Sequence, residues 1–137
     1  DKYGLTNDAS GYIEDQWDGS GSYSFHSSSR HDVTKQLYDN IMGVIYEIQK
    51  ELVSDEELMI AHNALADGVY EMKFKDGNAT ARSFAIEKLR YGNHHHSKSY
   101  PARVRSVTKK DVLRVANKYM HPDAFQVIIV GEHINLQ

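Results

Sequence analysis

The sequence predicts an α+β fold, in which several helices pack on one face of a small, mostly antiparallel sheet. Residues 31–52 and 53–72 carry apolar side chains at helical spacing. An alternating stretch at 23–28 is typical of a strand with one buried face, and a β-branched apolar run at 125–131 is typical of a central strand. Elements with one apolar face must cover it against another layer. We therefore expect residues 1–137 to form a single domain, or a fragment of one.

The composition restricts the class of protein. The chain has 137 residues, of which 40% are hydrophobic and 26% are charged, so it is expected to fold. Its net charge is -3, and Lys and Arg are scattered along the helices without a basic stripe, which argues against nucleic-acid binding. The absence of cysteine excludes disulfides and thiolate metal sites. No apolar run approaches the roughly 18 residues of a membrane span, and a start at Asp1 hints at an excised or processed piece.

The first thirty residues predict turns and strands. Residues 1–22 are polar and rich in Gly, Asp and Ser, and Tyr12 to Trp17 could form a short strand or an irregular lead-in. In the strand expected at 23–28, Tyr23, Phe25 and Ser27 would share one face. With the run at 125–131 this gives only two secure strands, and two strands make a poor sheet. We expect further strands of the sheet to lie outside this chain.

A long amphipathic helix is predicted from His31 to Leu52, with Asp32 as a candidate N-cap. Its apolar stripe consists of Leu37, Ile41, Val44, Ile45, Ile48 and Leu52. Gly43 lies inside the helix, where glycine costs about 1 kcal/mol relative to alanine. Close packing against another element would explain a glycine at this point.

The strongest local signal is the start of the next helix. Ser54 and Glu57 have the spacing of a capping box, and Val53 with Leu58 can close a hydrophobic staple across it. The face expected to point inward carries Leu58, Ala61, Leu65, Val69 and Met72. This helix follows the preceding one almost at once, so the two should form a helix pair.

The remaining helices are predicted from similar signals. A third helix runs from about Ala79 to Tyr91, and Gly92 is its candidate C-terminal cap. Its inward or half-inward residues would be Ala81, Phe84, Ala85, Lys88 and Leu89. Residues 93–99 read as a polar loop, and a helical turn is expected over 102–107. A second capping box at Thr108 and Asp111 opens a fourth helix, whose inward face would carry Val112, Val115, Ala116 and Tyr119.

No complete active site follows from the residues themselves. His94, His95 and His96 are consecutive, and they lack the spaced His–carboxylate set of a metal site, so a solvated loop is the favoured interpretation. The metallopeptidase motifs H-E-x-x-H and H-x-x-E-H are absent, as are a G-x-S-x-G elbow and a phosphate-binding glycine loop. Glu56 and Glu57 lie in the first turn of a helix, where they complement its dipole.

Several stretches together resemble the insulinase/pitrilysin family of zinc metallopeptidases, the inverzincins. The stretches are Gly19 to Phe25 before a long helix, Val53 to Leu58, and above all Arg103 to Tyr119 with Pro122-Asp123 and Val127 to Gly131. The resemblance covers roughly residues 13 to 132 and matches the second, C-terminal half of one repeated α+β domain. It implies a parent protein that hydrolyses peptides, in which paired domains form a hollow shell around the substrate.

The resemblance also implies where the chemistry lies. One domain of the family carries H-x-x-E-H and a distant glutamate as zinc site and general base, so zinc is expected in the parent protein and none in this chain. We therefore expect no catalytic residue here, and a scaffold, a chamber wall and a domain interface instead. The expected partners are a companion metallopeptidase domain or subunit and a peptide substrate. An inactive structural or peptide-binding subunit of the same fold is the alternative.

Two positions are candidates for contact with substrate. Tyr23 matches a family tyrosine that hydrogen-bonds near the scissile carbonyl, although an ordinary packing role in the sheet is the competing interpretation. The arginine usual seven residues earlier is replaced here by Gln16. An amide donates a hydrogen bond but supplies no fixed positive charge, which weakens the case for direct transition-state assistance. Family habit suggests a bacterial periplasm or cell-envelope setting.

Overall fold

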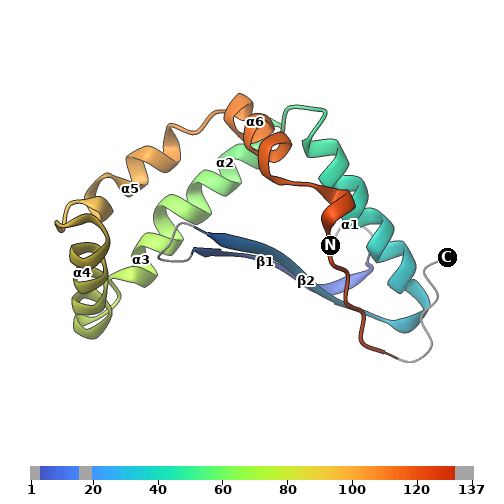
Figure 1. The fold of residues 1–137 in the computed structure, drawn as a ribbon, viewed down its shortest axis with the longest axis horizontal. Coiled ribbons are helices and arrows are strands. Elements are labelled where there is room, and N and C mark those ends of the chain that lie inside the picture. The colour runs from blue at the N-terminus through green and yellow to red at the C-terminus, as the bar shows by residue number, and fades with distance from the viewer. Residues whose placement is uncertain (1–3, 16–19, 132–137) are drawn as a thin grey trace. The chain divides into compact units, whose positions relative to one another are not determined.

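A computed structural model of the chain describes residues 4–15 and 20–131, and its fold class is α+β, as the sequence predicts (Figure 1). The chain forms two compact units, each described by itself below. The first unit comprises residues 1–47 and 120–137, and the second comprises residues 48–119. Within the described residues, no helix has both the length and the apolar character needed to span a membrane.

The first unit is built on an antiparallel hairpin of β1 (Thr6–Asp15) and β2 (Gly21–Ser29). The strand predicted at 23–28 is confirmed, whereas its partner begins at Thr6, well before the expected Tyr12. Cross-strand polar pairs hold the open end of the hairpin, and the Thr6 and Ser27 hydroxyl oxygens lie 2.8 Å apart there. Gly11 lies opposite Phe25, and a Cβ at Gly11 would meet the Phe25 ring at 3.5 Å, an ordinary contact.

Helix α1 (Thr34–Ile48) follows a short 3-10 turn, His31–Val33, so the expected N-cap at Asp32 is wrong. Ile45 is its buried residue, and the helix and the hairpin line a shared, mostly apolar cavity of about 400 Å³. Gly43 is exposed, and a Cβ there would have no neighbour within 4 Å. The prediction of close packing at this glycine is therefore wrong.

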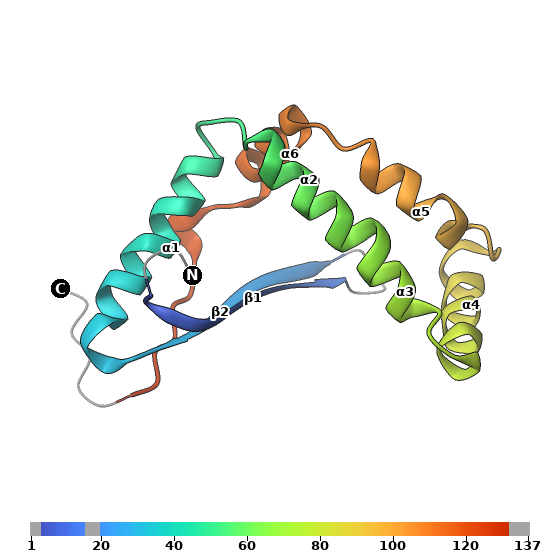
Figure 2. The same cartoon turned by 180° about the vertical axis from the view of Figure 1, so that it is seen from behind.

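The strand predicted at 125–131 does not form. Figure 2 shows this stretch as a coil that follows the 3-10 turn Pro122–Ala124. Phe125 starts it in an extended conformation, and its ring lies 5.6 Å from the ring of Tyr23. Among the described residues β2 pairs with β1 alone. The apolar run thus pairs with neither strand, and Ile128 and Val130 remain 85% and 93% exposed.

The second unit begins with a continuous helical rod that consists of α2 (Asp55–Asn63), a π-helical segment (Ala64–Val69) and α3 (Tyr70–Lys73). The capping box at Ser54 and Glu57 is confirmed. The predicted inward stripe is wrong, because Ala66 is buried whereas Leu65 and Met72 are exposed. A π-helical turn is wider than an α-helical turn. It therefore rotates the following residues away from the face that a regular spacing assigns to them.

Helix α4 (Gly77–Tyr91) starts at the N-cap Asp76, whose carboxylate accepts from the Ala79 N–H, and it ends at Gly92 with φ 72°. The predicted C-terminal cap is therefore confirmed. The predicted inward face is wrong, because Phe84 and Leu89 are exposed while Ser83 and Glu87 are buried. Helix α4 thus packs through polar side chains.

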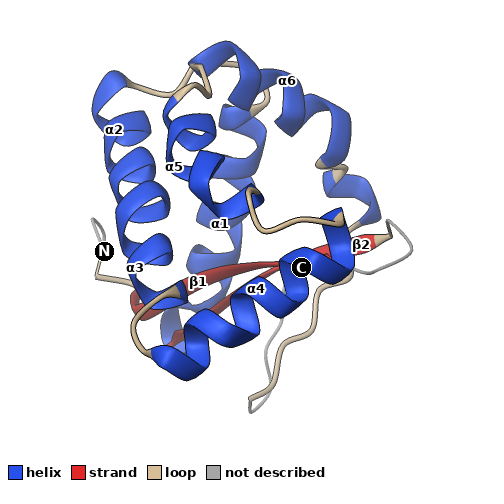
Figure 3. Ribbon diagram, turned by 90° about the vertical axis from the view of Figure 1, so that its left-hand side faces the viewer, coloured by secondary structure: helices blue, strands red, loops and turns tan. Residues whose placement is uncertain are grey.

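Helices α5 (His96–Arg105) and α6 (Lys109–Tyr119) complete the second unit. Residues 96–99, predicted as loop, form the first turn of α5, which packs along the π-helical segment (Figure 3). The second capping box is confirmed, since Thr108 and Asp111 exchange both of its hydrogen bonds. On α6, Ala116 is buried, whereas Val115 and Tyr119 of the predicted inward face are exposed.

Candidate functional site

A buried polar cluster joins three helices of the second unit. Lys73 of α3 places its Nζ 3.2 Å from Glu87 Oε1 on α4 and 2.8 Å from Ser97 Oγ on α5. The Ser97 hydroxyl also donates to Glu87 Oε1. Glu87 and Ser97 are 1% and 2% exposed, while the Lys73 side chain is 37% exposed. The Lys73 side chain is therefore partly in solvent, while its ammonium group pairs with the buried Glu87 carboxylate.

This cluster explains why α4 buries its polar face. Ser83 and Glu87 are four residues apart, so they share one face of the helix, and Ser83 Oγ donates to the Lys73 carbonyl at 3.1 Å. The neighbouring apolar side chain, Phe84, instead makes ring contacts with Phe74 and with His94. Hydrogen bonds to Lys73 and Ser97 set the orientation of α4, and the apolar spacing does not.

One atom of the cluster lacks a partner. Glu87 Oε2 is buried and accepts no hydrogen bond from the described residues. Burial raises the pKa of Glu87, but hydrogen bonds from Ser97 and Lys73 outweigh this effect and leave the pKa below its usual value. The carboxylate is therefore charged at neutral pH, and Lys73 compensates it from one side only.

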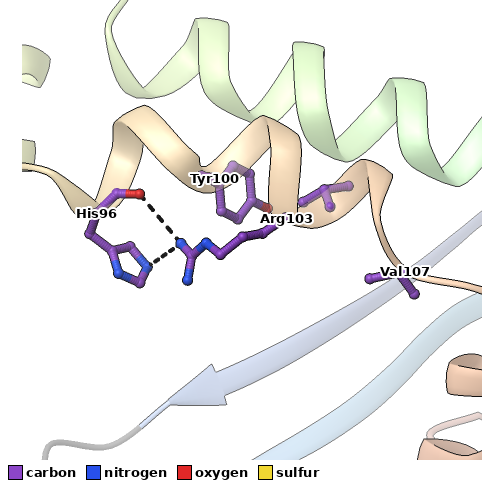
Figure 4. A pocket seen from close by; sticks show the side chains of 5 residues that line it. His96, Tyr100, Arg103 and Val107 are labelled. Carbon is purple, nitrogen blue, oxygen red and sulfur yellow. Dashed lines mark hydrogen bonds between the residues drawn. The ribbon is translucent and has the colours of Figure 1, made fainter.

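Beside the cluster, α5 and the nearby Val107 line an open cavity of about 270 Å³ at the surface (Figure 4). Tyr100, Val104 and Val107 supply its apolar part, and His96 and Arg103 lie at its other end. Arg103 reaches back along the helix, and its Nη2 lies 2.8 Å from His96 Nε2. A guanidinium group only donates, so His96 Nε2 accepts and the ring is neutral, with its proton on Nδ1.

The His96 ring is held in place on its other side. It stacks on Tyr91, with ring centroids 3.9 Å apart and an interplanar angle of 5°. Burial lowers the pKa of His96, and the positive charges of Arg103 and Lys73 lower it further, against the opposing effect of Glu87. The imidazole is therefore neutral at pH 7, in agreement with its role as acceptor.

The three consecutive histidines point to different partners and do not form a common site. His94 Nδ1 lies 3.2 Å from the Phe84 carbonyl oxygen, His95 is exposed, and His96 contacts Tyr91 and Arg103. His62, on α2, contacts the Val107 carbonyl oxygen. No group of three His, Cys, Asp or Glu side chains that could hold a metal ion occurs within residues 4–15 and 20–131.

The structure places one of the two candidate substrate contacts. Tyr23 lies on β2, half-buried, with its ring near those of Phe25 and Phe125. Gln16 lies outside the described residues. The ring contacts of Tyr23 show the packing role that the sequence offered as one of two interpretations, and the role in substrate contact stays a prediction.

Sequence reasoning missed both the buried cluster and the cavity. A signal for them existed, because no acidic residue occurs between Glu87 and Asp111. Lys and Arg recur through this stretch at Lys88, Arg90, Lys98, Arg103, Arg105, Lys109 and Lys110. An acid-free stretch in a chain of net charge -3 indicates cations whose counter-charges come from elsewhere. Arg105 is one such cation, because its Nη2 donates to Oδ1 and Oδ2 of Asp67 at 2.7 and 2.9 Å.

No family model matches the sequence, and no curated protein matches it.

Proposed function

We propose that this chain is the non-catalytic C-terminal part of a zinc metallopeptidase of the insulinase/pitrilysin type. Its contribution is scaffold, chamber wall and domain interface for the hydrolysis of peptides. The proposal rests on the sequence resemblance between Arg103 and Gly131 and on one structural observation, the apolar surface that both units leave uncovered.

That surface is large for a chain of this size. The described residues bury only four hydrophobic side chains: Leu5, Ile45, Ala66 and Ala116. Exposed large hydrophobic residues include Ile13, Met72, Leu89, Ile128 and Val130. Large apolar side chains that are this exposed on both units are candidates for contact with another protein. A role as one wall of a larger assembly accounts for this surface.

The sheet supports the same proposal. A two-stranded hairpin is marginally stable at best, and in the described residues neither strand has a second neighbour. An edge strand with free backbone groups is a template for pairing with another chain. Strands from a companion domain would complete the sheet next to Tyr23 and would cover Ile128 and Val130.

The described residues do not fit the zinc site of the family, because they contain no group of three possible ligands. The proposal therefore assigns the metal to the companion domain and assigns no step of the chemistry to this chain. Tyr23 remains its candidate contact with substrate, through the phenol hydroxyl.

The test is the protein encoded by the full-length gene. We expect an upstream H-x-x-E-H, stoichiometric zinc by mass spectrometry, and cleavage of fluorogenic peptides that a chelator abolishes. Zinc-free, inert protein would overturn the proposal in favour of the alternative, an inactive structural or peptide-binding subunit. Chelator-sensitive cleavage by this chain alone would overturn both.

Within the active protein, Tyr23→Phe tests the substrate contact. Removal of the hydroxyl is expected to lower kcat/KM about tenfold, because a hydrogen bond to developing charge is lost. Tyr12→Phe is the matched control, since Tyr12 lies on the adjacent strand with its ring against His26. Equal rates for the two variants would leave Tyr23 with its packing role alone.

A further inference from the structure

We propose that the α5 cavity binds the C-terminal residue of a peptide, with the terminal carboxylate on Arg103 and an apolar side chain against Tyr100, Val104 and Val107. The proposal concerns a binding site on this chain itself. It does not depend on the metallopeptidase proposal, because binding is measured without any cleavage.

The first argument is the set of donors that Arg103 leaves unused. A guanidinium group has five N–H donors in a planar fork. In Arg103 only Nη2 is engaged, with the neutral His96 ring at 2.8 Å and with the His96 carbonyl oxygen at 3.4 Å. No acidic side chain among those that the structure describes pairs with Arg103. Its charge is thus uncompensated, and its Nε and Nη1 donors have no protein acceptor there.

The nearby Arg105 shows which kind of group an arginine of this helix binds. It lies on the same helix, and its Nη2 donates to both carboxylate oxygens of Asp67, at 2.7 and 2.9 Å. Arginine is the side chain best suited to such planar recognition of carboxylates. In Arg103 the Nη2 atom is engaged by His96, so a carboxylate from outside the chain would be bound through the unused Nε or Nη1 donors.

The second argument is preorganisation. The contact with His96 fixes one end of the Arg103 side chain, and the stack on Tyr91 fixes the plane of His96. An arginine that is already held in place loses less conformational entropy when it binds an anion. The neutral state of His96 keeps it an acceptor for Arg103, so the two side chains do not repel each other.

The third argument is the apolar wall next to the guanidinium. Tyr100, Val104 and Val107 line the same cavity as Arg103. A peptide C-terminus carries a carboxylate and a side chain on one carbon atom, so it can satisfy both parts at once. Inorganic phosphate offers no apolar group, and an internal Asp or Glu has its carboxylate at the end of the side chain. The volume of about 270 Å³ suits a single residue, since pockets for drug-sized ligands span about 300–1,000 Å³.

The experiment is a nuclear magnetic resonance titration of the full chain with acetyl-Ala-Ala-Leu as the free acid. We expect saturable shifts at the backbone amides of Arg103, Val104 and Val107. The same peptide with an amidated C-terminus is the control on the unmodified protein. It should bind up to about fivefold more weakly, because the ion pair at an exposed arginine is lost. Equal affinity for the two peptides would overturn the proposal.

Variants separate the two halves of the site. Arg103→Gln should weaken the free acid about fivefold and leave the amide unchanged. Lys98→Gln is the matched control, since it removes a cation of α5 that does not line the cavity, and it should bind like the parent chain. Val104→Ser should weaken acetyl-Ala-Ala-Leu but leave acetate binding unchanged. If inorganic phosphate saturates the same amides as tightly as the peptide, the apolar half of the proposal is wrong.

Discussion

At the scale of single residues, the most unusual group is the Glu87 carboxylate. It is buried, its Oε1 atom receives donors from Lys73 and Ser97, and its Oε2 atom has no partner among the described residues. A buried charge that loses its only counter-charge is costly, whereas an apolar pair of similar shape in its place can be neutral. The cluster is therefore a place where a single change should cost more than a double change.

We expect Lys73→Met to lower the free energy of unfolding by about 1–2 kcal/mol, because it leaves the Glu87 charge buried without compensation. The value is at the low end for a buried pair, since the Lys73 side chain is 37% exposed and solvent already screens it. The double variant Lys73→Met with Glu87→Leu should recover most of this loss. Urea denaturation measures both, and Lys75→Met is the control. If the double variant instead loses the sum of the stabilities lost in the two single variants, Lys73 does not act as the counter-charge of Glu87.

The carboxylate of Asp111 gives a prediction that depends on pH. Hydrogen bonds from Thr108, aided by Arg114, lower the pKa of Asp111 from its ordinary 3.8 to about 2. A lowered pKa in the folded state stabilises the fold above about pH 4, and this contribution is lost as the pH falls from about 4 to about 2. Asp111→Asn should therefore lower the Tm at pH 7, and this difference in Tm should be clearly smaller near pH 2. A Tm difference that is the same at both pH values would show that charge plays no part, and Lys110→Gln is the control at the same helical turn.

At the scale of elements, the helix boundaries follow from local chemistry, whereas the buried faces do not. The capping boxes at Ser54 and Thr108 formed as predicted, because their partners lie three residues away. The inward face of α4 was wrong because Lys73 and Ser97, from other helices, select its polar side. The π-helical segment between α2 and α3 changes which residues face inward, and the spacing of apolar residues does not predict such a segment.

Two glycines, Gly43 inside helix α1 and Gly92 at the C-cap of α4, should respond to the same substitution with opposite signs. Gly43→Ala is expected to stabilise the protein by up to about 1 kcal/mol, because glycine is costly inside a helix and the new Cβ has no neighbour within 4 Å. Gly92→Ala should destabilise it by about 1 kcal/mol, since residue 92 has φ 72°. Thermal unfolding of the two variants measures both effects. If Gly43→Ala instead lowers the stability, the result would support the close packing at Gly43 that the sequence predicted.

At the scale of the whole molecule, the fold class was predictable and the sheet was not. The α+β class follows from periodicity, since helical and strand spacing are local properties of the chain. The strand at 125–131 was wrong because a strand exists only through hydrogen bonds to a neighbour, and this run pairs with neither β1 nor β2, although its composition is that of a strand. The candidate site was missed for a related reason: Lys73, Glu87, Ser97 and Arg103 are ordinary surface residue types until the helices bring them together.

The exposed apolar run gives the prediction at this scale. We expect Ile128→Lys with Val130→Lys to reduce self-association of the purified chain, because these side chains are 85% and 93% exposed and added charge opposes their apolar contacts. The Tm should remain unchanged, because neither residue is packed in the interior. Light scattering at several concentrations measures the association. Asp123→Asn with Gln126→Lys is the matched control, because it changes the net charge by the same amount and keeps the apolar run. An equal decrease in the control would attribute the effect to charge alone.

The salt bridge between Asp55 and Lys109 brings together the starts of α2 and α6, at 2.8 Å between Oδ1 and Nζ. Each of these starts carries the partial positive charge of a helix dipole, so two like poles meet at this point. The acidic side chains of both first turns offset that repulsion, and the Asp55–Lys109 ion pair joins the two helix starts across it. A junction of two like helix poles is therefore held by side-chain charge and not by the backbone.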